Sequence, residues 1–264
     1  MLLVSLGLLV GAVMGLTGAG GGILAVPALM FALDSPLAQV TPLALLAVAV
    51  SAAIGAWGGW RQGLVRYRAA ALMSLLGVPF TALGVRLGAA LSARQGAWLF
   101  VVLMLYIGGR QAYRLVRGQP TPAETLSQRP LDARSGRIVW SWRSGAVVAA
   151  IGAGTGLTTG LLGVGGGFII VPLLQRFSNI SIHGIVATAL MVIALVSGGG
   201  ALMALSHGAP LPPSIALPFV GAATLGMLAG RMWVRFLSPR VLQASFTVLV
   251  FVVACAVAVG SLTQ

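Results

Sequence analysis

Long apolar runs separated by short polar connections make up most of this chain of 264 residues. A helix needs about 20 apolar residues to cross the hydrocarbon core of a bilayer. Most of the runs without a charged side chain approach or exceed that length, so the pattern predicts an all-α integral membrane protein with several crossings. The uncharged runs are 1–33, 42–60, 69–85, 95–109, 144–175, 184–230 and 241–264.

The two halves of the chain show the same order of apolar runs. A long run is followed by a glycine-rich break, a short run and three longer runs, and a polar stretch rich in proline, serine and arginine separates the halves. We predict a first transmembrane repeat at 1–117, a cytoplasmic polar linker at 118–143 and a second transmembrane repeat at 144–264. The runs are 2–16, 23–33, 40–60, 69–91 and 95–116 in the first half, and 144–162, 168–177, 184–206, 212–236 and 241–262 in the second.

The glycine breaks themselves are repeated. Residues 15–27 read GLTGAGGGILAVP and residues 160–172 read GLLGVGGGFIIVP, so that five glycines, a valine and a proline coincide at a spacing of 145 residues. Glycine-interrupted hydrophobic segments in corresponding positions of two halves are typical of the binding site of a transporter.

The arginines predict which connections face the cytoplasm. The polar linker and the connections 61–68 and 231–240 each carry at least three arginines, whereas 206–214 carries none. Because cytoplasmic connections are enriched in Lys and Arg, the first three are placed inside and 206–214 outside. Arg86 and Arg94 then lie outside and are the exceptions to this topology.

This topology constrains the glycine breaks. It requires an even number of passes between the linker and residue 184, so the segment around each break enters the membrane and returns, either as a re-entrant hairpin or as two short helices. The run 23–33 is indeed too short to span alone. The predicted fold is a polytopic helical protein of two inverted repeats, each with a glycine-broken hairpin and three spanning helices.

The breaks are also the best candidates for a binding site. Broken helix inside a membrane must be buried or line a water-filled cavity, and glycine lets a ligand approach the main chain. A helix that begins after the break presents unpaired N–H groups and its positive end, which suits an anion. The alternative is close helix packing through small residues, and a Ser or Thr near the break often bonds its own helix. The predicted substrate-binding residues are Thr17, Gly18, Gly20, Gly21, Gly22, Thr41, Ser51, Gly163, Gly165, Gly166, Gly167, Thr188 and Ser197.

Other functional classes find little support in the sequence. The net charge of +13 comes from arginines spread over short connections, without a nucleic-acid-binding motif, so we predict no nucleic-acid partner. The only acids are Asp34, Glu124 and Asp132, and no carboxylate pair, nucleophile–base pair or metal-binding cluster can be assembled by spacing. We therefore predict no catalytic residues, no metal site and no cofactor.

The segments GLTGAGGGILAVPAL and GLLGVGGGFIIVPLL, each opening a half with several helices, resemble the TauE/SafE sulfite exporter family over nearly the whole chain. The resemblance implies a bacterial inner-membrane permease that exports sulfite, sulfonates such as sulfoacetate, or related small anions. The matching positions are the two glycine–proline motifs and, more loosely, Thr41 and Thr188. Pro42, which follows Thr41 directly, departs from the second half.

These observations lead to one hypothesis and several alternatives. The chain is expected to be a passive or ion-coupled secondary transporter that exports sulfite, sulfoacetate or a related sulfonate across the bacterial inner membrane by alternating access. The alternatives are an importer or channel for another small anion, and a membrane scaffold or assembly protein that transports nothing. The expected partners are the small anion and the lipid bilayer, and the pattern leaves the oligomeric state open, a homodimer included.

Overall fold

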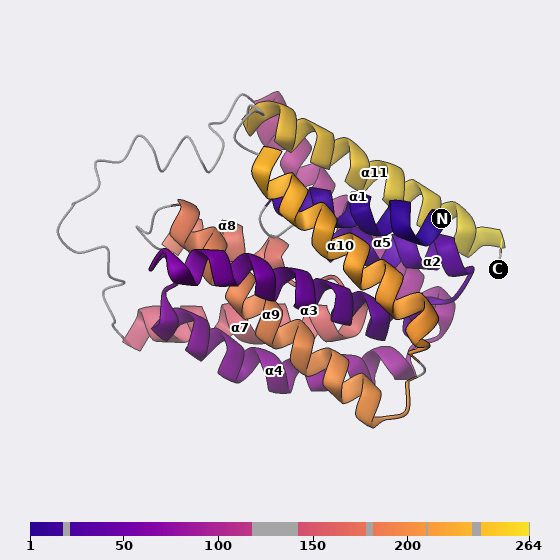
Figure 1. Ribbon diagram of the computed structural model, residues 1–264, viewed down its shortest axis with the longest axis horizontal. Coiled ribbons are helices and arrows are strands. Elements are labelled where there is room, and N and C mark those ends of the chain that lie inside the picture. Colours follow the sequence, from indigo (N-terminus) through magenta and orange to yellow (C-terminus); the bar gives the residue numbers. More distant parts are fainter. Residues whose placement is uncertain (18–21, 118–141, 178–181, 210, 234–238, 264) are drawn as a thin grey trace.

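The computed structural model describes residues 1–17, 22–117, 142–177, 182–209, 211–233 and 239–263, which form helices joined by short connections, without strands. Figure 1 shows the helices packed side by side, with the N-terminal end of α1 and the C-terminal end of α11 at the same end of the bundle. The predicted all-helical fold class is confirmed. The helices are α1 (Leu2–Thr17), α2 (Gly22–Leu33), α3 (Leu37–Arg61), α4 (Tyr67–Ala90), α5 (Ala93–Val116), α7 (Trp142–Leu162), α8 (Gly167–Phe177), α9 (Ile182–Ser206), α10 (Pro213–Trp233) and α11 (Pro239–Thr263).

The second glycine break divides two helices as predicted, because α7 ends at Leu162 and α8 begins at Gly167. In the first half, α1 ends at Thr17 and α2 begins at Gly22, and the residues between them lie outside the described part of the chain. The helices that follow the breaks, α2 and α8, have 12 and 11 residues and are therefore under about 20 Å long, short of a bilayer core of about 30 Å. The linker predicted at 118–143 lies almost entirely outside the described residues.

Within the described residues, five helices are long and apolar enough to cross a membrane, namely α3, α4, α7, α9 and α10. A polytopic membrane protein is thus confirmed. Helix α5 has 24 residues but carries arginines toward its ends. In α11, the apolar part within the described residues is Thr247–Val259, which is shorter than a full crossing. Their role as the third crossing of each half stays a prediction.

The start of α5 is fixed by a local hydrogen-bonding motif. The Ser92 hydroxyl accepts a hydrogen bond from the Gln95 N–H at 3.2 Å, and the Gln95 side-chain oxygen accepts one from the Ser92 N–H at 3.1 Å. This reciprocal capping box satisfies two amide groups that a helix N-terminus otherwise leaves unpaired. The turn between α4 and α5 is therefore set by the sequence itself.

Helices α3 and α9, which occupy equivalent places in the two halves, pack antiparallel. Residue numbers rise along one helix as they fall along the other at the points of contact. Equivalent helices that run in opposite directions are what inverted repeats require, although the orientation of the halves in a bilayer stays a prediction. These contacts are the ones that a β-carbon added at each glycine would make with the facing helix. They pair Gly200 with Leu45, Gly198 with Ala49, Gly55 with Leu190, and Gly59 with Ala187.

Helix α10 shows that α1 and α3 run in the same direction. Both pack on α10 with residue numbers that rise together, so both are parallel to it. Because α1 and α3 are parallel, the chain between them, which contains α2, must come back across the bundle, as the distribution of arginines predicts. The contacts are Gly7 with Phe219 and Gly15 with Met227 for α1, and Gly55 with Met227 and Gly58 with Arg231 for α3.

Stripes of glycine join the two halves. Helix α1 packs on α10 and helix α7 packs on α4, so a helix of each half lies on a helix of the other half. A β-carbon at Gly156 of α7 would meet the Gly77 carbonyl of α4, and a β-carbon at Gly11 of α1 would meet the Ala223 carbonyl of α10. Small residues allow such close backbone approach, which drives helix association in membranes. The stripes are Gly7, Gly11 and Gly15 in α1, and Gly152, Gly156 and Gly160 in α7.

The glycine stripe on α7 gives a test of this packing. Gly156→Ala should lower the free energy of unfolding by about 1–3 kcal/mol, because the added methyl group overpacks the contact with α4. Gly154 of the same helix has no atom within 4 Å of an added β-carbon, so Gly154→Ala should be neutral or stabilising by up to about 1 kcal/mol. Thermal unfolding in detergent measures both, and equal losses in the two variants would contradict the packing described.

Candidate functional site

The second glycine break turns sharply within four residues. Gly163, Gly165 and Gly166 have φ angles of 70°, 69° and 57°, a region that residues with a β-carbon rarely adopt. The Gly163 N–H donates to the Thr159 carbonyl at 2.8 Å and closes α7, and the Ile169 N–H donates to the Gly166 carbonyl at 3.0 Å in the first turn of α8. The glycines are therefore required by the backbone conformation of the break.

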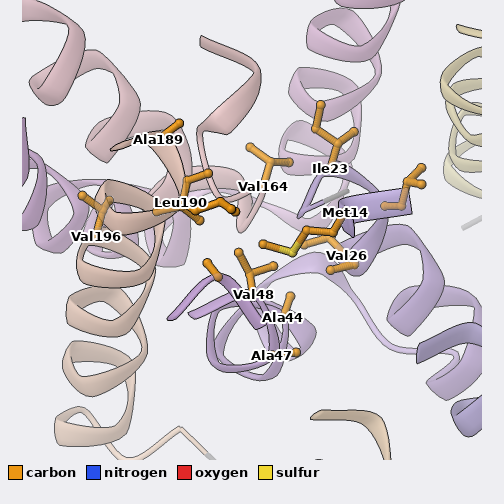
Figure 2. Packing of buried hydrophobic residues seen from close by; sticks show 14 of the residues in the cluster. Met14, Ile23, Val26, Ala44, Ala47, Val48, Val164, Ala189, Leu190 and Val196 are labelled. Carbon is orange, nitrogen blue, oxygen red and sulfur yellow. The ribbon is translucent and has the colours of Figure 1, made fainter. Parts of the chain in front are cut away.

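This break lies directly against the start of α2. A β-carbon at Gly22, the first residue of α2, would lie 2.8 Å from the Val164 carbonyl oxygen, and one at Gly165 would lie 3.8 Å from the Gly22 Cα. Figure 2 shows Val164 between Leu190 of α9 and Ile23 of α2, within the buried core. The N-terminal ends of α2 and α8 are thus neighbours at the centre of the bundle.

The structure therefore brings together five of the predicted site glycines, all of them buried. Gly18, Gly20 and Gly21 lie outside the described residues, so their part in the site stays a prediction. The five are Gly22, Gly163, Gly165, Gly166 and Gly167.

The break leaves backbone donors without partners. In the part of the chain that the structure describes, the N–H groups of residues 164–167 donate no hydrogen bond to a backbone carbonyl. They precede or open α8, where the helix dipole adds a partial positive charge of roughly +0.5. Buried N–H groups at the positive end of a helix are the usual elements of an anion site.

Two threonines that the sequence analysis missed lie beside these amides. Thr155 and Thr159 of α7 are fully buried, and neither hydroxyl has a hydrogen-bond partner. A β-carbon at Gly166 would lie 2.7 Å from the Thr159 Oγ1 and would also contact the Thr155 methyl group. Their spacing of four residues, which places them on one face of the helix that leads into the break, is the signal that could have found them.

Ser51 and Ser197 form a second pair of buried hydroxyls without partners. They lie on α3 and α9 at a spacing of 146 residues, close to the repeat spacing, and are 1% and 0% exposed. Gly165 faces Val48 of α3 and Ile193 of α9, which stand three and four residues before the two serines in their helices. Buried hydroxyls that bond nothing cost stability, which favours a role with a ligand.

The three predicted threonines are placed differently, because their hydroxyls bond their own helices. Thr17 donates to the Val13 carbonyl at 2.8 Å, Thr41 to the Leu37 carbonyl at 2.7 Å, and Thr188 to the Gly184 carbonyl at 2.6 Å. Such back-bonding is common for threonine in membrane helices. Thr41 still lies near the break, since its Oγ1 is 3.4 Å from the position of a β-carbon at Gly163.

Two arginines lie near one end of α3. The Thr188 hydroxyl accepts a hydrogen bond from the Arg66 N–H at 3.0 Å, and the Arg231 guanidinium donates to the Gly55 carbonyl at 2.6 Å. The Arg66 Nε is buried and has no partner. Because Asp34 is the only acid within the described residues, these guanidinium groups leave a positive field at this end of the bundle.

The site is neutral in its side chains and closed in this conformation. The described glycines are buried, as are the hydroxyls of Thr155, Thr159, Ser51 and Ser197, and no residue of 1–33, 35–60, 144–175 or 184–230 carries a charged side chain. A cavity of about 650 Å³ lies elsewhere, between α1, α2, α5 and α11, and none of the described site residues lines it. A ligand can therefore reach the site only if helices move.

The contrast between Ser197 and Thr188 gives a test of the site. Ser197→Ala should leave the thermal unfolding temperature unchanged or raised, because it removes a buried hydroxyl without a partner. Thr188→Val should lower the free energy of unfolding by about 1–3 kcal/mol, because it leaves the Arg66 N–H unpaired. Thermal unfolding in detergent compares the variants, and an equal loss for Ser197→Ala would show that its hydroxyl is structural.

The chain is similar to membrane transporters over most of its length. The model of the family described as Sulfite exporter TauE/SafE matches residues 3–257. A probable membrane transporter protein of Xylella fastidiosa (strain 9a5c) is 28% identical over 256 residues, which cover 93% of this chain and 90% of that protein. The probable membrane transporter protein MamO of Paramagnetospirillum magneticum is 24% identical over 268 residues, which cover 92% of this chain but 42% of MamO. No solved structure matches the chain.

Proposed function

This chain belongs to the TauE/SafE sulfite exporter family and is a multi-pass membrane transporter, not an enzyme; from this premise, we propose that it exports a small sulfur-containing anion across the bacterial inner membrane. The proposed substrates are sulfite, sulfoacetate and related sulfonates. The proposed site consists of the amides of both glycine breaks and the buried hydroxyls beside them.

The observation that carries this proposal is the meeting of two helix N-termini in a core without charged side chains. Two positive helix ends in contact repel each other, and a small anion between them would relieve that repulsion. The oxygens of sulfite or a sulfonate accept hydrogen bonds, and amides and hydroxyls are the donors they need. The polar groups without partners at this point are therefore explained by an oxyanion ligand.

Alternating access fits the packing of the helices. The pairs α1–α10 and α7–α4 are each held by close backbone contacts at glycines, so each pair can move as a unit. The pairs are related by exchange of the two halves and pack on the antiparallel helices α3 and α9. Movement of one pair against α3 and α9 would open the buried site to one side of the membrane, and movement of the equivalent pair would open the other.

The membrane potential favours one direction of anion transport. An inside-negative potential favours the exit of an anion by about 2.3 kcal/mol for each charge and each 100 mV. Export through a passive carrier therefore needs no coupled cation, which suits a chain with only three acidic residues, one of them within the described residues. The arginine-rich connections support a cytoplasmic linker and hence an inner-membrane orientation.

Flux in proteoliposomes tests the proposal. The purified protein should carry sulfite or a sulfonate in a saturable manner, and a potassium–valinomycin potential should accelerate or reverse the flux according to its sign. Chloride and sulfate serve as comparison anions. Flux that rises linearly with concentration would instead indicate a channel, and no flux of any anion through folded protein would favour a scaffold.

A substitution at the break tests the assignment of the site. Gly166→Val should reduce flux at least about tenfold, because a β-branched residue is strained at a φ of 57° and its side chain would meet Thr155 and Thr159. Membrane insertion and elution as a folded protein should persist. The control is Gly154→Ala on the preceding helix, which should transport as the wild type does. Full activity of Gly166→Val would contradict the site assignment.

A further inference from the structure

The central site has no full charge of its own, and that limits the charge of its ligand. We propose that it binds oxyanions with a single negative charge, such as bisulfite and alkylsulfonates, and rejects dianions such as sulfate and fully deprotonated sulfite. This inference rests on the proposed function and narrows its substrates to bisulfite and sulfonates without a second charged group. Sulfoacetate, whose carboxylate makes it a dianion at neutral pH, is thereby excluded. It also assigns the discrimination between monoanions and dianions to the N-terminal ends of α2 and α8 and to four hydroxyls, those of Thr155, Thr159, Ser51 and Ser197.

The positive charge available at the site amounts to about one unit. The N-terminal ends of α2 and α8 each contribute roughly +0.5, and Gly22, the first residue of α2, lies against Gly165, two residues before α8 begins. The Arg231 guanidinium bonds the Gly55 carbonyl, seven residues and hence about 10 Å along α3 from Val48, which contacts the break. One negative charge is therefore balanced at the site, and a second is not.

Burial makes the unbalanced charge decisive. Every described group at the site is buried, so a ligand held there gives up most of its hydration. The cost of removing an ion from water is large in a medium of low polarity, and it rises with the square of the charge. A dianion would lose about four times the hydration free energy of a monoanion of the same size and recover at most twice the attraction, so the site disfavours it.

The hydroxyls suit the shape of such a ligand. Thr155 and Thr159 lie on α7 beside Gly166, and Ser51 and Ser197 lie on α3 and α9 near the residues that contact Gly165, so hydroxyl donors are available on three helices. The counterparts of Thr155 and Thr159 at the repeat spacing of 145 are Val10 and Met14, which makes the site asymmetric. Three oxygens of a sulfonate can face the hydroxyls and amides, and its carbon substituent can face apolar side chains such as Val48 and Ile193.

Competition in proteoliposomes tests the inference with methanesulfonate as the transported probe. Methanesulfonate and isethionate, which are monoanions at every pH used, should compete at least about tenfold better than the dianions sulfate and methanedisulfonate. Sulfite flux should fall as pH rises and bisulfite loses its proton, while methanesulfonate flux stays constant. Equal competition by sulfate, or sulfite flux that rises with pH, would overturn the monoanion rule. Absence of flux for every anion would instead remove the proposed function on which it rests.

Variants of α7 test the role of the hydroxyls. Thr159→Val should raise the KM for methanesulfonate about tenfold, and Thr159→Ser, which keeps the hydroxyl, should restore it. Thr158→Val is the matched control, because the Thr158 hydroxyl donates to the Gly154 and Thr155 carbonyls of its own helix at 3.0 Å. An unchanged KM in Thr159→Val would overturn the assignment of that hydroxyl.

Binding without transport gives an independent readout. Methanesulfonate should raise the thermal unfolding temperature of the wild-type protein in detergent and should raise that of Thr159→Val less, whereas sulfate should leave both unchanged. If sulfate stabilised the wild-type protein as much as methanesulfonate does, the limit to a single negative charge would be contradicted.

Discussion

A backbone that breaks inside a membrane must find its hydrogen-bond partners within the protein, and this constraint governs the whole structure. The second break lies against the first residue of α2. At the second break, the left-handed glycines close one helix and open the next within four residues. The amides that remain unpaired are buried at the centre of the bundle, where only a ligand or a neighbouring hydroxyl could pair them.

The glycines serve two separate purposes along the same segment. Those inside α1 and α7 allow backbones from opposite halves to touch, and those in the second break supply the left-handed conformation. Gly160 and Gly163 stand three residues apart and show the division, since Gly160 packs on Thr81 of α4 while Gly163 turns the chain. Packing and ligand binding are alternatives for the sequence motif as a whole, and the structure assigns packing to Gly15 and Gly160.

Much of the local architecture follows from the sequence because apolar length and glycine placement act locally. The predicted run 168–177 becomes α8 at Gly167–Phe177, and the parallel direction of α1 and α3 agrees with a chain that returns between them. The choice of partners is different, because it depends on shape complementarity between distant segments. Nothing in the run 2–16 shows that it packs on α10 of the other half.

The fate of individual hydroxyls could not be predicted for the same reason. Thr188 and Ser197 lie nine residues apart in one helix, yet one hydroxyl bonds its own helix and the Arg66 amide while the other bonds nothing. The difference depends on which groups of neighbouring helices come within reach. Thr155 and Thr159 escaped prediction because their counterparts in the first half, Val10 and Met14, are apolar and so gave no repeat signal.

The most direct test of the account is to locate a bound oxyanion. Selenite, which resembles sulfite and scatters anomalously through its selenium, can be soaked into crystals of the protein. The account predicts a selenite whose oxygens lie within hydrogen-bonding reach of the amides of 164–167 and of the hydroxyls of Thr159 and Ser197. Selenium bound only in the cavity beside α11 or at the arginines near the end of α3, with the centre empty, would contradict it.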